Sequence, residues 1–287
     1  MSYLLLMGCI GCTTASGLCA SFFNRKNAGY KNPTPVYNLI MAVCALICWA
    51  IMYFQNFTFQ PGVLLYSLGF GLCYTGAIVG HINALKNGPL SLTTLFMQMS
   101  GIGTAIWGFF FWDAKPSFTV ILGLVLIVAA LILCLYQSGA GYRLSLKWVL
   151  LAAGASLSNV GCAVIQKTQQ IDFDYQYGDM MMFFSMIIAV IVCTVIFLKA
   201  RPEKPLEIFK RTAAFPMIAG ILNMVVNLFT ILLAASPLPT SLVYPTNSVG
   251  SLALTSIASL FLFKEKLSVR QWIGVAVGAA AIALLSI

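Results

Sequence analysis

Apolar stretches of about 20 residues recur along this chain between short polar breaks, and a helix of that length crosses the ~30 Å hydrocarbon core of a bilayer. Runs such as Val120 to Leu135 are apolar on every side and lack the alternation of a membrane β-barrel. The pattern therefore predicts an all-α membrane protein with ten transmembrane helices. We place them at residues 3–23, 36–54, 62–85, 89–112, 117–136, 146–166, 179–198, 212–234, 239–263 and 268–287.

Composition agrees with a membrane environment. Apolar residues make up 60% of the 287 residues and charged residues only 8%, with a mean hydropathy of +0.94. Most of the nine cysteines lie inside the apolar stretches, and Cys9 and Cys12 share only the spacing of a redox pair. We interpret the cysteines as small packing residues, so no cofactor and no metal site is expected.

Basic residues are distributed unevenly between the connections. Loops after odd-numbered predicted helices hold 14 Lys and Arg, whereas loops after even-numbered helices hold only Lys115 and Lys167. Because these charges are scattered over loop ends, they do not favour nucleic-acid binding. The positive-inside rule places the odd-numbered connections in the cytoplasm. We therefore expect a multi-pass protein of the plasma (inner) membrane with both termini outside the cytoplasm.

The two halves of the chain resemble each other. Pro89–Leu92 aligns with Pro239–Leu242 at an offset of 150, and residues 113–117 align with 264–268 after a one-residue slip. We expect a first five-helix repeat at 1–138, a linker at 139–145 and a second repeat at 146–287. An odd number of helices inverts the second repeat relative to the first, an arrangement common in transporters.

Several motifs of the second half carry a family resemblance. They are Ser236–Pro239, Tyr244–Pro245, Phe263–Ser268 and Gln271–Gly274, with a weaker first-half counterpart at Asn83–Ser91. With these motifs the chain resembles the EamA-type transporters of the drug/metabolite transporter superfamily. The resemblance implies ten helices in two five-helix repeats and transport of a small solute, which it does not name. Well-studied members keep both termini in the cytoplasm, so the charge bias departs from the family here.

Polar side chains deep in the predicted spans must face other helices or a water-filled cavity. In 239–263, helical spacing places Tyr244, Ser248 and Ser251 on one face, with Asn247 beside it, and Thr94 and Gln98 hold the related positions in 89–112. A hydroxyl can instead bond back to its own helix, whereas an amide needs several partners. Second-rank candidates for substrate binding are Asn223, Asn227, Asn159, Tyr74 and Thr14.

The only histidine, His81, has two interpretations. It could carry a coupling proton, or it could be a solvated or interhelix-bonded side chain, which we favour. No Asp or Glu lies in mid-span, and the closest is Asp179 at the start of its helix. Because an unpaired buried cation is costly, the composition favours a neutral or zwitterionic polar solute.

We therefore expect a secondary transporter that works by alternating access and is not an enzyme. A Walker-type ATP motif is absent from the sequence, and one histidine without a mid-span acid makes a poor catalytic site. The alternatives are a proton-coupled exporter of organic cations or drugs, and a non-transporting membrane subunit or lipid scramblase. Expected partners are a small-molecule solute and membrane lipids. The glycine pairs Gly76/Gly80 and Gly274/Gly278 suit either internal packing, which we favour, or a homodimer seam.

The orientation can be tested with reporters fused after Ile287. An even number of spans and cytoplasmic basic loops place the C-terminus outside the cytoplasm. A reporter that works only outside the cytoplasm should therefore be active when it is fused after Ile287. Activity confined to a cytoplasmic reporter would refute the orientation or show an odd number of spans.

Overall fold

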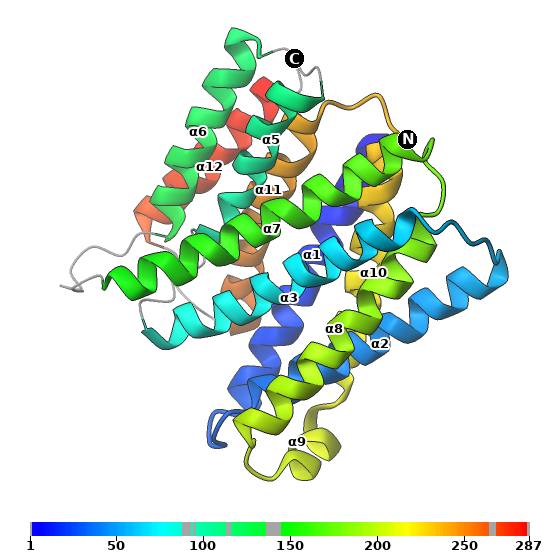
Figure 1. The fold of residues 1–287 in the computed structure, drawn as a ribbon. Coiled ribbons are helices and arrows are strands. Elements are labelled where there is room, and N and C mark those ends of the chain that lie inside the picture. The colour runs from blue at the N-terminus through cyan, green and yellow to red at the C-terminus, as the bar shows by residue number, and fades with distance from the viewer. Residues whose placement is uncertain are drawn as a thin grey trace. The chain divides into compact units, whose positions relative to one another are not determined.

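Every regular element in the described part of the chain is a helix, which confirms the all-α prediction (Figure 1). The computed structural model describes residues 2–87, 93, 96–112, 116–135, 145–263 and 268–285. The helices are α1 (Ser2–Lys26), α2 (Thr34–Gln55), α3 (Val63–Asn87), α5 (Ser100–Phe111), α6 (Phe118–Leu135), α7 (Leu146–Asp172), α8 (Gly178–Ala200), α9 (Pro205–Thr212), α10 (Ala214–Ala234), α11 (Thr240–Phe263) and α12 (Val269–Leu285).

Six helices are long and apolar enough to cross a membrane: α1, α2, α3, α7, α8 and α10. Shorter apolar helices lie at Phe118–Leu133 and Val269–Leu285. The predicted span at 89–112 falls partly outside the described residues, so the count of ten spans stays a prediction. The short helix α9 was not expected from the sequence.

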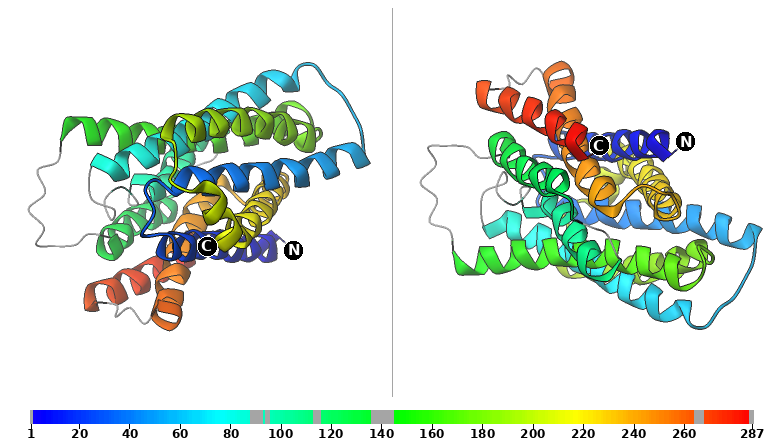
Figure 2. Two further views of the ribbon diagram at one scale, coloured as in Figure 1. Left: turned by 90° about the horizontal axis from the view of Figure 1, so that it is seen from below. Right: turned by 90° about the horizontal axis from the view of Figure 1, so that it is seen from above.

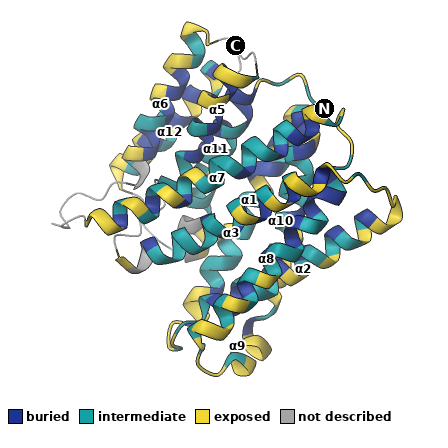
Figure 3. Ribbon diagram, in the orientation of Figure 1, coloured by how far each residue is buried: buried dark blue, intermediate teal, exposed yellow. Residues whose placement is uncertain are grey.

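Large apolar side chains cover much of the helix surfaces. Leu65, Phe110 and Phe118 are 73%, 77% and 79% exposed, and exposed positions recur along most helices (Figure 3). A water-soluble protein limits contiguous exposed apolar surface to small patches. Helices also satisfy their own backbone hydrogen bonds, so helices with apolar side chains on the outside are suited to the hydrocarbon core of a membrane.

The chain forms two compact units, and each contains residues from both halves of the sequence. The first unit comprises Tyr3–Thr75 and Ile165–Ala235, and the second comprises Gly76–Val164 and Ser236–Ile287. Helices α3 and α7 each contribute to both units. The compact units are therefore not the two predicted repeats. The predicted boundaries of the repeats stay a prediction, and most of the linker at 139–145 lies outside the described residues.

In the first unit, α2 packs against α8 in the antiparallel direction. Tyr53 near the end of α2 stacks on Phe183 near the start of α8, with ring centroids 5.1 Å apart. At the opposite end, the Asn32 side-chain amide donates to the Ala200 carbonyl at 3.3 Å. The second and seventh predicted spans are thus neighbours.

In the second unit, α6 packs against α12, and both views of Figure 2 show the two helices near each other. A Cβ at Gly123, early in α6, would lie 2.8 Å from the Leu285 side chain at the end of α12. A Cβ at Gly278 would lie 3.6 Å from Ala130, later in α6. This pair is also antiparallel. Inverted repeats produce this relation between equivalent helices.

Helix α10 packs closely against α2 at Gly220, where a larger side chain would not fit. A Cβ at Gly220 would lie 2.6 Å from the Met41 carbonyl oxygen and 2.8 Å from Cys44 Cβ. Because backbone cannot yield easily, Gly220→Ala should lower the free energy of unfolding by about 1–3 kcal/mol. The measurement is the thermal unfolding midpoint of the purified protein in detergent.

Gly17→Ala in α1 is the matched control, because a Cβ there meets nothing within 4 Å. Alanine is a better helix former than glycine by up to about 1 kcal/mol, so this variant should keep or raise the midpoint. An unchanged midpoint for Gly220→Ala would contradict the packing.

Candidate functional site

Helices α5 and α11 of the second unit approach each other closely at Gly101. A Cβ at Gly101 would lie 2.7 Å from Ser248 Oγ and 2.8 Å from the Tyr244 carbonyl oxygen. Further along α5, a Cβ at Gly108 would lie 3.4 Å from Thr240 Cβ at the start of α11. Residue numbers rise along α5 as they fall along α11, so this pair is antiparallel too. Two members of the predicted stripe, Tyr244 and Ser248, therefore meet α5.

Helix α7 contacts both α5 and α11 near Gly101. The Asn159 side-chain amide donates to Ser100 Oγ at 2.9 Å, and the Ser100 hydroxyl donates to the Met97 carbonyl at 2.7 Å. The Tyr244 hydroxyl reaches toward the Ala163 carbonyl at 3.5 Å. We call Ser100, Gly101, Asn159, Tyr244 and Ser248 the polar cluster.

The polar cluster carries no formal charge at neutral pH. Asn159, Tyr244 and Ser248 are half-buried, while Ser100 is buried. An amide and a hydroxyl can each donate and accept hydrogen bonds, and tyrosine adds a flat apolar ring. These groups suit a polar solute without net charge better than an isolated ion.

Other predicted residues of the second unit lie near this cluster in sequence. Asn247 on α11 and Gln98, in the helical segment before α5, are both half-buried. The Ser251 hydroxyl donates to the Ser248 carbonyl of its own helix at 3.1 Å, which is the back-bonding alternative considered for hydroxyls. Thr94 lies outside the described residues.

Four predicted residues belong to the first unit. Thr14 is buried and donates to the Ile10 carbonyl one turn earlier at 2.8 Å. Tyr74 stacks on Phe70 with centroids 6.1 Å apart. On α10, the Asn227 side-chain amide donates to the Asn223 carbonyl at 2.8 Å. Each of these three contacts joins residues of the same helix.

Helix α7 also places an amide against α10 in the first unit. Gln166 Nε2 donates to the Asn227 carbonyl at 3.3 Å, and Gln166 is only 3% exposed. This bond joins two helices through a backbone carbonyl.

His81 lies on the part of α3 that belongs to the second unit. Its Nδ1 is buried and has no hydrogen-bond partner among the described residues. A role in proton coupling stays a prediction. No group of three His, Cys, Asp or Glu side chains placed to hold a metal ion occurs within the described ranges.

Ser100 was not among the predicted site residues, although its spacing carries a signal. Ser100 and Thr104 are four residues apart inside the apolar span at 89–112, and so lie on one helical face. The Thr104 hydroxyl donates to the Ser100 carbonyl at 3.1 Å. What the sequence could not show was the partner, since Asn159 is 59 residues away.

The bond between Asn159 and Ser100 can be tested with a double-mutant cycle. Asn159→Ala and Ser100→Ala should each destabilise the protein, and the double variant should lose less than their sum. Interhelical hydrogen bonds in membrane proteins give coupling energies of about 0.6 kcal/mol. Thermal or denaturant unfolding in detergent measures the four midpoints. Strictly additive losses would show that the side chains do not interact.

Comparison with known proteins agrees with these features. The family model described as "EamA-like transporter family" matches residues 3–136 and again residues 146–287. A solved structure titled only "Crystal structure of protein" has a TM-score of 0.76 and 12% identity, over 99% of this chain and 95% of that chain. At that identity the similarity shows the fold alone. The comparison with curated proteins gave no match. Because the family model covers nearly the whole sequence in two copies, the chain belongs to the EamA-like transporter family and is a multi-pass membrane protein.

Proposed function

We propose that this protein is a secondary transporter that moves a small neutral or zwitterionic polar metabolite by alternating access, and that the polar cluster forms part of its binding site. The observation that carries the proposal is the convergence of an amide and several hydroxyls from α5, α7 and α11. Asn159 bonds Ser100 across two helices, and Ser248 lies against Gly101.

The chemistry of these helices argues against a cationic solute. Neither α5, α11 nor residues 146–164 of α7 contain an Asp or a Glu. An organic cation bound there would lose its hydration without gaining an opposite charge, which is costly in a medium of low polarity. A neutral solute, or a zwitterion that carries both charges close together, avoids that cost and can use neutral donors and acceptors.

The bond between Asn159 and Ser100 is one that a bound solute could replace with hydrogen bonds of its own. An amide in hydrocarbon is expensive when it lacks a partner, so polar groups at a transport site need partners in every state. The Asn159 to Ser100 bond supplies such a partner in this state. A solute that offers a donor and an acceptor could replace it at small net cost, because one hydrogen bond is exchanged for another.

Substrate screening tests the proposal directly. The purified protein is reconstituted in liposomes and assayed for exchange of amino acids, nucleosides and organic cations. We expect exchange of at least one neutral or zwitterionic solute and none of the cations. Exchange of organic cations alone would overturn the solute class, and no exchange of any solute would count against transport by the chain.

Variants of the neighbouring amides then test the site. Asn247→Ala and Gln98→Ala should each lower transport about fivefold, the loss expected when one hydrogen bond of ~1 kcal/mol to a solute is removed. Transport should fall more than the thermal midpoints do, because neither side chain is fully buried.

Asn87→Ala is the matched control for those amides. Asn87 is exposed at the end of α3, where its amide donates to the Asn83 carbonyl at 2.7 Å. This variant should transport normally. Wild-type transport by both Asn247→Ala and Gln98→Ala would remove them from the site.

A further inference from the structure

Four apolar helices begin or end at one end of the first unit. There α1 ends at Lys26, α2 begins at Thr34, α8 ends at Ala200 and α10 begins at Ala214. The loop after α1 and the segment containing α9 connect them. These four helices are candidate membrane spans, so this end lies where the spans leave the hydrocarbon.

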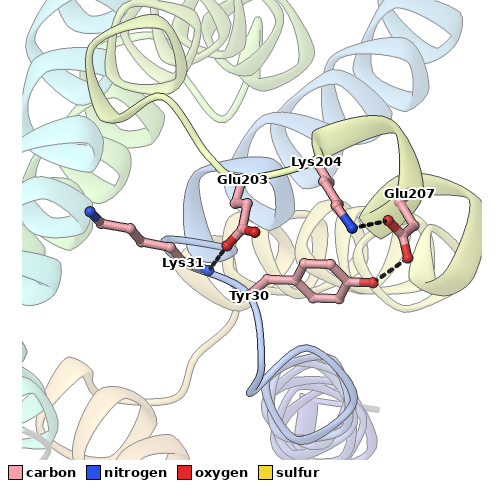
Figure 4. A network of polar contacts seen from close by, with 5 residues as sticks. All are labelled: Tyr30, Lys31, Glu203, Lys204 and Glu207. Carbon is pink, nitrogen blue, oxygen red and sulfur yellow. Dashed lines mark hydrogen bonds and ion pairs between the residues drawn. The ribbon is translucent and has the colours of Figure 1, made fainter.

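Hydrogen bonds join the two connections at this end (Figure 4). The backbone N–H of Lys31 donates to Glu203 Oε2 at 3.2 Å, and the N–H of Glu203 donates back to the Lys31 carbonyl at 3.1 Å. The Tyr30 hydroxyl donates to Glu207 Oε1 at 2.7 Å, and Lys204 Nζ lies 3.5 Å from Glu207 Oε2. The hydrogen bond from Tyr30 lowers the pKa of Glu207, so this carboxylate stays ionised and occupied.

Positive charge is concentrated on these connections. Together with the last turns of α1 and α8, they hold eight of the sixteen Lys and Arg, and all eight are exposed. The only acidic residues in the same segments are Glu203 and Glu207, which already take part in the contacts of Figure 4. We call the eight residues the basic cap: Arg25, Lys26, Lys31, Lys199, Arg201, Lys204, Lys210 and Arg211.

Helix α9 adds an apolar surface beside these charges. Ile208 and Thr212, four residues apart, are 0% and 1% exposed and face the unit's core. Leu206 and Phe209, three residues apart, form a second side and are 65% and 45% exposed. Lys210 lies next to this exposed side. An amphipathic helix with exposed apolar residues and adjacent lysine is typical of helices that lie in a membrane interface.

We propose that the basic cap and α9 form a binding site for the headgroups of anionic phospholipids. The exposed Leu206 and Phe209 would contact the outer part of the acyl chains, while the basic side chains reach the lipid phosphates. Phosphate oxygens are the natural partners of Lys and Arg, and juxtamembrane clusters of four to eight such residues attract anionic lipids. The site is independent of the transported solute, because all its residues lie at one end of the first unit, in the connections or in the last turns of α1 and α8.

The test uses the full chain in nanodiscs of phosphatidylcholine alone or phosphatidylcholine with phosphatidylglycerol. Native mass spectrometry counts the lipids that stay bound after release, and thermal unfolding reports their effect on stability. We expect phosphatidylglycerol to be retained several-fold over phosphatidylcholine and to raise the unfolding midpoint. Soluble glycerol phosphate should not raise it. Equal retention of the two lipids, or the same rise with glycerol phosphate, would overturn the proposal.

Lys31→Gln/Lys210→Gln weakens the basic cap without removing any of the hydrogen bonds or the ion pair drawn in Figure 4. The Lys31 amino group points away from Glu203 (Figure 4), and only its backbone bonds that residue. This variant should lose at least half of the preference for phosphatidylglycerol and keep the wild-type midpoint in phosphatidylcholine.

The matched control removes two exposed charges from the second unit, in Lys147→Gln/Arg270→Gln. Its preference should stay close to that of the wild type. An equal loss in both variants would show a response to total charge rather than a site, and an unchanged preference in Lys31→Gln/Lys210→Gln would also overturn the proposal.

Discussion

The constraint on which this structure depends is that each backbone N–H and C=O in hydrocarbon needs a partner within the protein. Helices meet that need with their own backbone hydrogen bonds. Many of the described hydroxyls also bond to a carbonyl of their own helix. Thr14, Thr75 and Thr104 each donate to a carbonyl of the preceding turn. A hydroxyl satisfied in this way can face lipid or another helix without cost, so it says little about function.

Helix association then has to come from close packing and a few polar cross-links, because lipid chains are as apolar as the side chains they would replace. Gly220 brings α10 onto the backbone of α2, and Gly101 brings α5 onto that of α11. The Ser185 hydroxyl donates to the Ser67 carbonyl of α3 at 3.0 Å, so one bond also joins α8 to another helix. Gly76 and Gly80 meet Ser158 and Ala155 of α7, which is the internal packing favoured for that pair.

Local features of the fold were predictable because length and hydropathy are properties of single segments. The all-α class and the family resemblance were confirmed, and most helix ends lie within a few residues of the expected ones. Helix α9 was missed because its eight residues include three charged ones and no long apolar run. Which helices pack together depends on surfaces from distant segments. The bond between Asn159 and Ser100, and the composition of the two units, therefore could not be read from spacing.

Equivalent positions in the two sequence repeats need not have the same role in the structure. The offset of 150 pairs Gln98 with Ser248 and Gly101 with Ser251. At the crossing of α5 and α11, Gly101 provides the space and Ser248 provides the hydroxyl, so the two helices contribute different groups to one contact. Under the proposed function, a solute bound beside this close contact would meet unlike donors and acceptors on its two sides. Such asymmetry favours one orientation of the solute, because the reversed orientation would leave polar groups without partners, at a cost comparable to a lost hydrogen bond.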